Sequence, residues 1–134
     1  MASSQLQEAL EGVLDSANER VVAAYLFGSV ARGTESAGSD VDIGILLRSK
    51  QVETLDSLRF SLEGDLEPAA GRRVQVVVLN DAPPDLVHRV LRDGHLLLDR
   101  DRSLRIRFEV DARNRYFDLL PILEEYRKPR MVAK

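Results

Sequence analysis

The sequence predicts an α+β fold, with a small mixed β-sheet of about four strands, helices that back it and a helix at the C-terminus. Two observations predict this fold. Short runs rich in β-branched and aliphatic residues, typical of buried strands, alternate along the chain with longer segments whose apolar residues recur at helical spacing. The length of 134 residues suits one domain with a real core. We therefore expect a single domain over 1–134, in which 101–134 is a helical extension.

The first half of the chain is expected to hold a helix, two strands and a second helix. Ser3 or Ser4 is expected to cap a helix that begins "QLQEALEGVL", whose leucines form one apolar stripe. The runs "RVVAAYLF" (20–27) and "DVDIGILL" (40–47) indicate buried strands, joined by a short turn or helix "SVARG" and a loop "TESAGS". The segment "QVETLDSLRFSLEGDL" has a helical pattern, and "EPAAG" is expected to break it.

The second half is expected to hold two strands and two helices. "RRVQVVVLN" (72–80) is β-branched and indicates a strand, and a proline pair opens a short helix to about residue 92. "HLLLD" (95–99) indicates a last strand. Between 103 and 126, "LRIRFEV" alternates as a strand would, but Ile106, Val110, Phe117 and Leu120 fit a helical stripe over the longer window. We predict a helix there, interrupted at Pro121.

Composition excludes several classes of site. The chain has no cysteine, which excludes disulfides, thiolate catalysis and thiolate zinc sites. It has no apolar run of about 18 residues and no signal-peptide pattern at its start, so we expect no membrane association and a cytoplasmic location. The net charge of −3 argues against direct nucleic-acid binding. Residues 101–134 are nevertheless basic, which suits an acidic partner, RNA or nucleotide phosphates, or is simply a solvated helix face.

A Gly-Ser pair at the end of the first predicted strand indicates a phosphate-binding turn. Gly28 lets the backbone approach a ligand closely, and the start of a short helix offers free N–H groups to a phosphate. Ser29 adds a hydroxyl donor, and Arg32 adds a charge one turn on.

Asp40 and Asp42 stand at the start of the next predicted strand, and residues two apart on a strand point to the same face. Their carboxylates should repel each other unless they are protonated or bridged by a cation. Oxygen ligands of this kind suit Mg²⁺, which commonly binds through carboxylates and substrate phosphates. A surface pair that only aids solubility is the alternative for these two residues taken alone.

The Gly28-Ser29 pair, followed after ten residues by Asp40-Val41-Asp42, resembles the signature of nucleotidyltransferases related to DNA polymerase beta. The segments "RRVQVVVLNDAPPDLVHRVLRDGHLLL" and "FEVDARNRYFDLLPILEEYR" resemble its smallest branch, the minimal nucleotidyltransferases. The resemblance implies transfer of a nucleoside monophosphate from a triphosphate to a hydroxyl. In that chemistry Gly28 and Ser29 hold the terminal phosphates, Asp40 and Asp42 bind Mg²⁺, and ATP is the substrate.

The sequence departs from this family at the third catalytic carboxylate, because the matching position holds Gln75. A polar residue inside a buried strand is expected to face the site, but glutamine cannot act as a base. Asp81 is roughly 20 Å further along the strand at ~3.3 Å per residue, which makes it a poor substitute, and Glu109 or Asp111 stays open as a replacement. We expect ATP and one Mg²⁺ to bind and transfer to be slow.

Small stand-alone members of this branch act as antitoxins that pair with an all-helical HEPN ribonuclease toxin. The resemblance therefore implies an antitoxin that transfers AMP to a hydroxyl of its toxin, a tyrosine in some pairs, and it is compatible with a homo- or hetero-oligomer. Two alternatives stay open: a module that neutralises its partner by binding alone, and a transferase that acts on RNA or a small molecule.

The histidines and the aromatic residues of the C-terminal segment are expected to be structural. His88 and His95 lack metal-ligand spacing and are expected to be structural or on the surface. Core packing is favoured for Tyr116, Phe117 and Tyr126, with a partner-facing aromatic set as the alternative.

Overall fold

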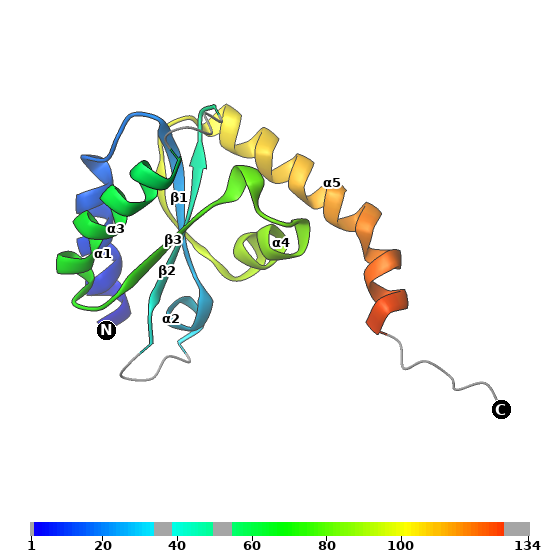
Figure 1. The fold of residues 1–134 in the computed structure, drawn as a ribbon, viewed down its shortest axis with the longest axis horizontal. Helices are drawn as coiled ribbons and strands as arrows, with labels where there is room; N and C mark the ends of the chain where they lie inside the picture. The colour runs from blue at the N-terminus through cyan, green and yellow to red at the C-terminus, as the bar shows by residue number, and fades with distance from the viewer. Residues whose placement is uncertain (1, 34–38, 50–54, 128–134) are drawn as a thin grey trace.

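A four-stranded sheet with helices on both faces organises residues 2–33, 39–49 and 55–127, which the computed structural model describes (Figure 1). The strands are β1 (Val21–Phe27), β2 (Val41–Leu47), β3 (Val74–Val78) and β4 (His95–Asp99). The α-helices are α1 (Ala2–Asp15), α2 (Gly28–Arg32), α3 (Leu55–Ala70), α4 (Pro84–Asp93) and α5 (Arg102–Arg127). A short 3-10 helix, η2 (Leu79–Asp81), follows β3. The predicted α+β fold with its C-terminal helix is confirmed.

The sheet is mixed, with the strand order β3-β2-β1-β4. β1 pairs antiparallel with β2 on one side and with β4 on the other, whereas β2 and β3 run parallel. A parallel pair needs a crossover connection, and α3 lies within that connection. β3 is therefore an edge strand, next to the strand that carries Asp42.

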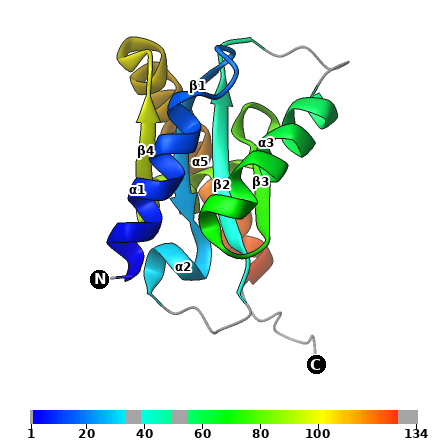
Figure 2. The ribbon, with the colours of Figure 1, turned by 90° about the vertical axis from the view of Figure 1, so that its left-hand side faces the viewer.

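Apolar side chains fill one layer on each face of the sheet. The first layer joins the sheet to α1 and α3, which contribute Leu10, Leu14, Leu62 and Leu66. The second joins the sheet to α4 and α5, which contribute Val87, Val90 and Ala112. In Figure 2, α1 and α3 lie in front of the sheet and α5 lies behind it. Within the part of the chain that the structure describes, no helix is both long and apolar enough to cross a membrane.

Arg100 fastens the end of α1 to the end of β4. Its guanidinium donates hydrogen bonds to five main-chain carbonyls at 2.9–3.1 Å; two of them belong to Leu14 and Asp15 in the last turn of α1, and a third belongs to Ala17 just after the helix. The last carbonyls of a helix have no partner within the helix, and a cation there also complements the helix dipole. One side chain thus closes α1 and fixes the turn that leads into β1.

Three predicted boundaries are wrong. α1 begins at Ala2, ahead of the serine cap expected at residue 3 or 4. α3 continues through Pro68 to Ala70, because a proline in the last turn removes only one helical hydrogen bond, and the helix ends at Gly71, which has a φ of 68°. β3 ends at Val78; Asn80 then continues the ladder with its side chain, which bonds both the N–H and the carbonyl of Leu47 at 2.9 Å. The expected loop over 34–39 lies almost wholly outside the described residues.

The C-terminal segment is one helix that presents apolar side chains on two faces. α5 runs without interruption through Pro121, so the predicted break there is wrong. The face toward the sheet carries Leu104, Phe108 and Ala112, whereas Ile106 and Val110 are exposed. The two faces explain the strand-like alternation of "LRIRFEV", because successive apolar residues point alternately to opposite sides of the helix. The predicted helix is confirmed, but its expected stripe is the exposed one.

Candidate functional site

The phosphate-turn candidate lies where β1 passes directly into α2. β1 ends at Phe27 and α2 begins at Gly28, whose φ of 80° lies in the left-handed region. A Cβ at this position would overlap the carboxylate of Asp42. Glycine is therefore needed here both for the backbone conformation and for the close approach of the turn to β2.

Strand register places the predicted phosphate-binding turn and the predicted aspartate pair side by side. Asp42 on β2 pairs with Phe27 on β1, the residue just before the turn, and with Gln75 on β3. Asp40 lies two residues earlier, one residue before β2 begins. Arg72 also holds this part of the chain, since its guanidinium donates to the carbonyl of Ser39 at 3.4 Å. The Gly-Ser turn, the two carboxylates and the glutamine thus meet at one end of the sheet.

The electrostatics of the carboxylate pair favour a bound cation. Burial raises the pKa of the Asp42 carboxyl, the negative charge of Asp40 raises it further, and the positive charge of Arg32 opposes both. Arg32 is itself exposed on the last turn of α2. A divalent cation between the two carboxylates would remove the repulsion and favour the charged form of Asp42. The residues present therefore fit a magnesium ion.

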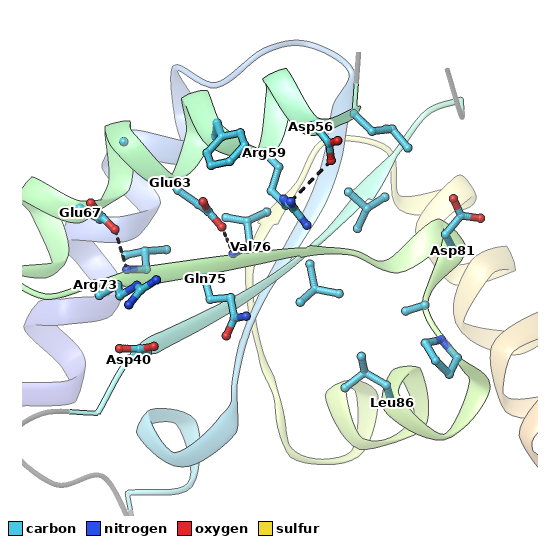
Figure 3. Close-up of a pocket in the computed structure, with 18 residues that line it drawn as sticks. Asp40, Asp56, Arg59, Glu63, Glu67, Arg73, Gln75, Val76, Asp81 and Leu86 are labelled. Carbon is cyan, nitrogen blue, oxygen red and sulfur yellow. Dashed lines mark hydrogen bonds and ion pairs between the residues drawn. The ribbon is translucent and has the colours of Figure 1, made fainter. Parts of the chain in front are cut away.

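Gln75 opens onto a cleft beside the edge strand. The cleft has a volume of about 830 Å³ and lies between β3, α3 and the start of α4, with Asp40 and Gln75 among its lining residues. Figure 3 shows Asp40 and Gln75 on one side of β3 and Glu63 on the other, with Asp81 at the far end. Asp40 and Gln75 thus border a space large enough for a ligand.

No other acid takes the place of the third carboxylate within the described residues. Glu109 accepts hydrogen bonds from Tyr25 and Arg105, and Asp111 pairs with Arg115 on α5. Asp81 follows the end of β3 in η2. Across the residues described, no three His, Cys, Asp or Glu side chains come together as a metal site would require. Gln75 is the side chain that faces the pair from β3.

Sequence reasoning missed the α3 side of the cleft. Glu63 and Glu67 accept hydrogen bonds from the main-chain N–H groups of Val76 and Val74 at 2.8 and 3.2 Å, so two carboxylates occupy donors on the open edge of β3 (Figure 3). Charged side chains on an edge strand hinder pairing with another strand. Phe60 on α3 also lines the cleft and is 66% exposed. The only sequence feature that indicates this arrangement is the spacing of four residues between the two glutamates, which places them on one face of the helix.

The two histidines have structural contacts, as expected. The ring of His88 stacks on Tyr116 with a centroid distance of 3.7 Å, which fastens α4 to α5. His95 Nε2 lies 3.1 Å from the carbonyl oxygen of Ala31. Core packing is confirmed in part for Tyr116, but it is wrong for Phe117 and Tyr126, which are exposed.

Sequence comparison finds relatives among nucleotidyltransferases. Residues 8–103 match the family described as polymerase beta, nucleotidyltransferase. Over 74 residues the chain is 36% identical to the protein adenylyltransferase MntA of Shewanella oneidensis. That match covers 54% of this chain, and the chain spans about half, 50%, of the length of that relative.

Structural comparison finds the same fold in several solved proteins. A structure assigned to the minimal nucleotidyltransferases is 31% identical, with a TM-score of 0.50, and the match covers 71% of this chain and 95% of that one. A chain from a toxin–antitoxin crystal structure with AMP-PNP has a TM-score of 0.70 at 22% identity and covers 91% and 98% of the two chains. A chain from the complex of tri-AMPylated Shewanella oneidensis HEPN toxin with MNT antitoxin has a TM-score of 0.67 at 19% identity, covering 94% and 99%.

Proposed function

The chain belongs to the polymerase beta nucleotidyltransferase family, and from that premise we propose that it is an antitoxin that transfers AMP from ATP to a hydroxyl of a partner HEPN toxin. The observation that carries the chemistry is the strand register, which joins the Gly28 turn, Asp42 and Gln75 at one end of the sheet. The observation that supports the partner is the similarity to MntA and to antitoxin chains solved with HEPN toxins.

In the proposed reaction, the acceptor oxygen forms a bond to the α-phosphorus of ATP. The bond from that phosphorus to the β-phosphate oxygen breaks, pyrophosphate leaves, and the hydroxyl proton passes to solvent. Gly28 and Ser29 bind the terminal phosphates, because the absence of a side chain at Gly28 lets the main chain approach them. Asp40 and Asp42 would hold Mg²⁺, which would supply positive charge to the triphosphate.

Gln75 limits the rate of this reaction. Its amide can donate a hydrogen bond and its carbonyl can accept one, but neither group takes up a proton at neutral pH. A general base in this position typically contributes roughly 10²–10⁴-fold. We therefore expect nucleotide binding to be retained and transfer to be slower by about that factor.

The same residue favours a second function, in which the protein neutralises its partner by binding alone. Within the described residues no acid replaces Gln75. A protein with this site would still bind the nucleotide but would not transfer AMP rapidly. The two functions differ in whether the partner gains mass.

Mass spectrometry of the partner separates the two functions. The purified protein is incubated with ATP, Mg²⁺ and the helical protein encoded beside it, and the intact mass of that partner is measured over time. The addition of one or more AMP groups, lost in Asp40→Asn and Asp42→Asn but retained in the control Asp65→Asn on the far side of α3, supports transfer. A tight complex without mass change, unaffected by either site variant, leaves binding alone.

Restoring the missing carboxylate tests the role of Gln75 directly. Gln75→Asp should increase the single-turnover transfer rate by roughly 10-fold or more, because an aspartate supplies the base and a further metal ligand. A Gln75→Asn control keeps a neutral amide of similar size to aspartate and should give no gain. An equal rate in both variants would contradict the assigned role of this position.

A further inference from the structure

The exposed face of α5 carries an apolar stripe that no described element of the chain covers. Ile106, Val110 and Phe117 lie within about 40° of one another around the helix axis at ~100° per residue. They are 40%, 50% and 60% exposed. The opposite face of the same helix already packs against the sheet and α4 through Phe108 and Ala112. The stripe is therefore not needed for the fold of this chain, and its exposure is unfavourable in water.

Charge changes sign along this stripe. In the first half of α5 the exposed side chains that flank it are basic: Arg102, Arg107 and Arg113. In the second half the exposed flanking side chains are mostly acidic, namely Asp118, Glu124 and Glu125, with Arg127 as the basic exception at the end of the helix. Neither Asp118 nor Glu124 forms a salt bridge with another residue in the described ranges.

We propose that a second copy of this chain docks on the stripe, with the two α5 helices packed antiparallel. In that orientation the basic half of each helix faces the acidic half of the other, whereas a parallel pair would place like charges together. A two-fold axis makes the same patch serve both copies, which is the commonest arrangement in soluble oligomers. The apolar stripes then bury each other, and the charges fix the orientation.

The position of α5 leaves room for this pairing. The helix has 26 residues, which corresponds to about 39 Å at 1.5 Å per residue. Figure 1 shows its orange and red part running past α4 and away from the sheet. Most of α5 also lies beyond residue 103, where the nucleotidyltransferase match ends. The pairing does not involve Asp40 or Asp42, because Asp42 lies on β2, and β1 separates that strand from β4 and the start of α5.

Complementary charge variants test the antiparallel dimer. Arg107→Glu with Arg113→Glu makes both halves of the stripe acidic, and Asp118→Lys with Glu124→Lys makes both halves basic. Analytical ultracentrifugation across a concentration series should show a dimer for the native chain and a dissociation constant raised about tenfold or more for each double variant alone. An equimolar mixture of the two double variants should dimerise again, because each acidic helix then meets a basic one.

Controls separate this pairing from other causes. Arg89→Glu with Arg115→Glu makes the same change in net charge away from the stripe and should leave the dimer intact, and Phe117→Ser should dissociate it without a charge change. Circular dichroism checks that each variant is folded. A native chain that stays monomeric at every concentration, or a mixture that stays monomeric when each variant is folded, would overturn the proposal. A monomer that binds a helical partner through Phe117 would assign the stripe to that partner instead.

Discussion

Among the described residues, replacing Gly28 with alanine should destabilise the protein more than replacing either of the other glycines that have a positive φ. Gly28, Gly33 and Gly71 have φ values of 80°, 74° and 68°, so alanine at each carries a backbone penalty of about 1–2 kcal/mol. A Cβ meets nothing within 4 Å at Gly33 or Gly71. At Gly28 it overlaps the Asp42 carboxylate, and overpacking of this kind typically adds about 1–3 kcal/mol.

The free energy of unfolding, measured by urea titration with circular dichroism, checks this difference. We expect losses of about 1–2 kcal/mol for Gly33→Ala and Gly71→Ala and about 2–5 kcal/mol for Gly28→Ala. Combining Gly28→Ala with Asp42→Ala removes the overlapping carboxylate, so the double variant should lose the overpacking penalty and keep only the backbone penalty. Equal losses at all three glycines would refute the close approach of the turn to β2.

Three further predictions concern pH, a partly buried hydrogen bond and the end of α1. Burial and the charge of Asp40 raise the pKa of Asp42 in the folded state. The Asp42 carboxyl therefore stabilises the folded state at low pH, and this contribution is lost as the pH rises through its folded pKa. Asp42→Asn should raise the melting temperature at pH 7 relative to the native chain and leave it nearly unchanged near pH 3. Tyr25→Phe removes the 2.7 Å hydrogen bond that the tyrosine donates to Glu109 and should lower the free energy of unfolding by about 1–3 kcal/mol in urea titration, whereas an unchanged value would mean that the bond is absent in solution. Arg100→Ala leaves helix-end carbonyls without their donor, so amide hydrogen exchange should accelerate across α1 before it does in the sheet; uniform exchange would contradict the capping role.

The predicted strands and the two halves of the site follow from local patterns. Runs such as "VVAAYLF" are continuous and apolar because β1 is buried on both faces. Gly28 and Asp42 could be assigned to one site because their spacing resembles the nucleotidyltransferase signature, which requires the chain to return alongside itself. The antiparallel pairing of β1 with β2 is that return.

The α3 side of the cleft could not be predicted, since its contacts depend on how the crossover helix lies on the sheet. Glu63 and Glu67 resemble ordinary solvated helix residues until β3 lies beside them as an edge strand. Pro68 favours a break locally, yet the remaining helical bonds and the packing of Leu66 hold the last turn of α3. In both cases, the glutamates beside β3 and the helix that continues through Pro68, tertiary contacts outweigh the preference of the local sequence.

The sequence alone also could not predict which face of α5 packs against the sheet. Leu104 and Phe108 form one apolar stripe and Ile106 and Val110 another, and a periodicity count alone does not tell which one meets the sheet. The polar contacts of the helix settle it: Arg105 pairs with Asp99 of β4 at 2.9 Å, and Glu109 accepts from Tyr25 of β1. These partners are far apart along the chain, so no local pattern encodes them.

Titration calorimetry of ATP in the presence and absence of Mg²⁺ tests most directly whether the Gly28 turn and the aspartate pair form one nucleotide site. We predict that the native chain binds ATP with Mg²⁺, that chelation by EDTA weakens binding at least about tenfold, and that Asp40→Asn or Asp42→Asn does the same while Asp65→Asn does not. Equal affinity with and without Mg²⁺, or affinity that is unchanged in both site variants, would contradict this account.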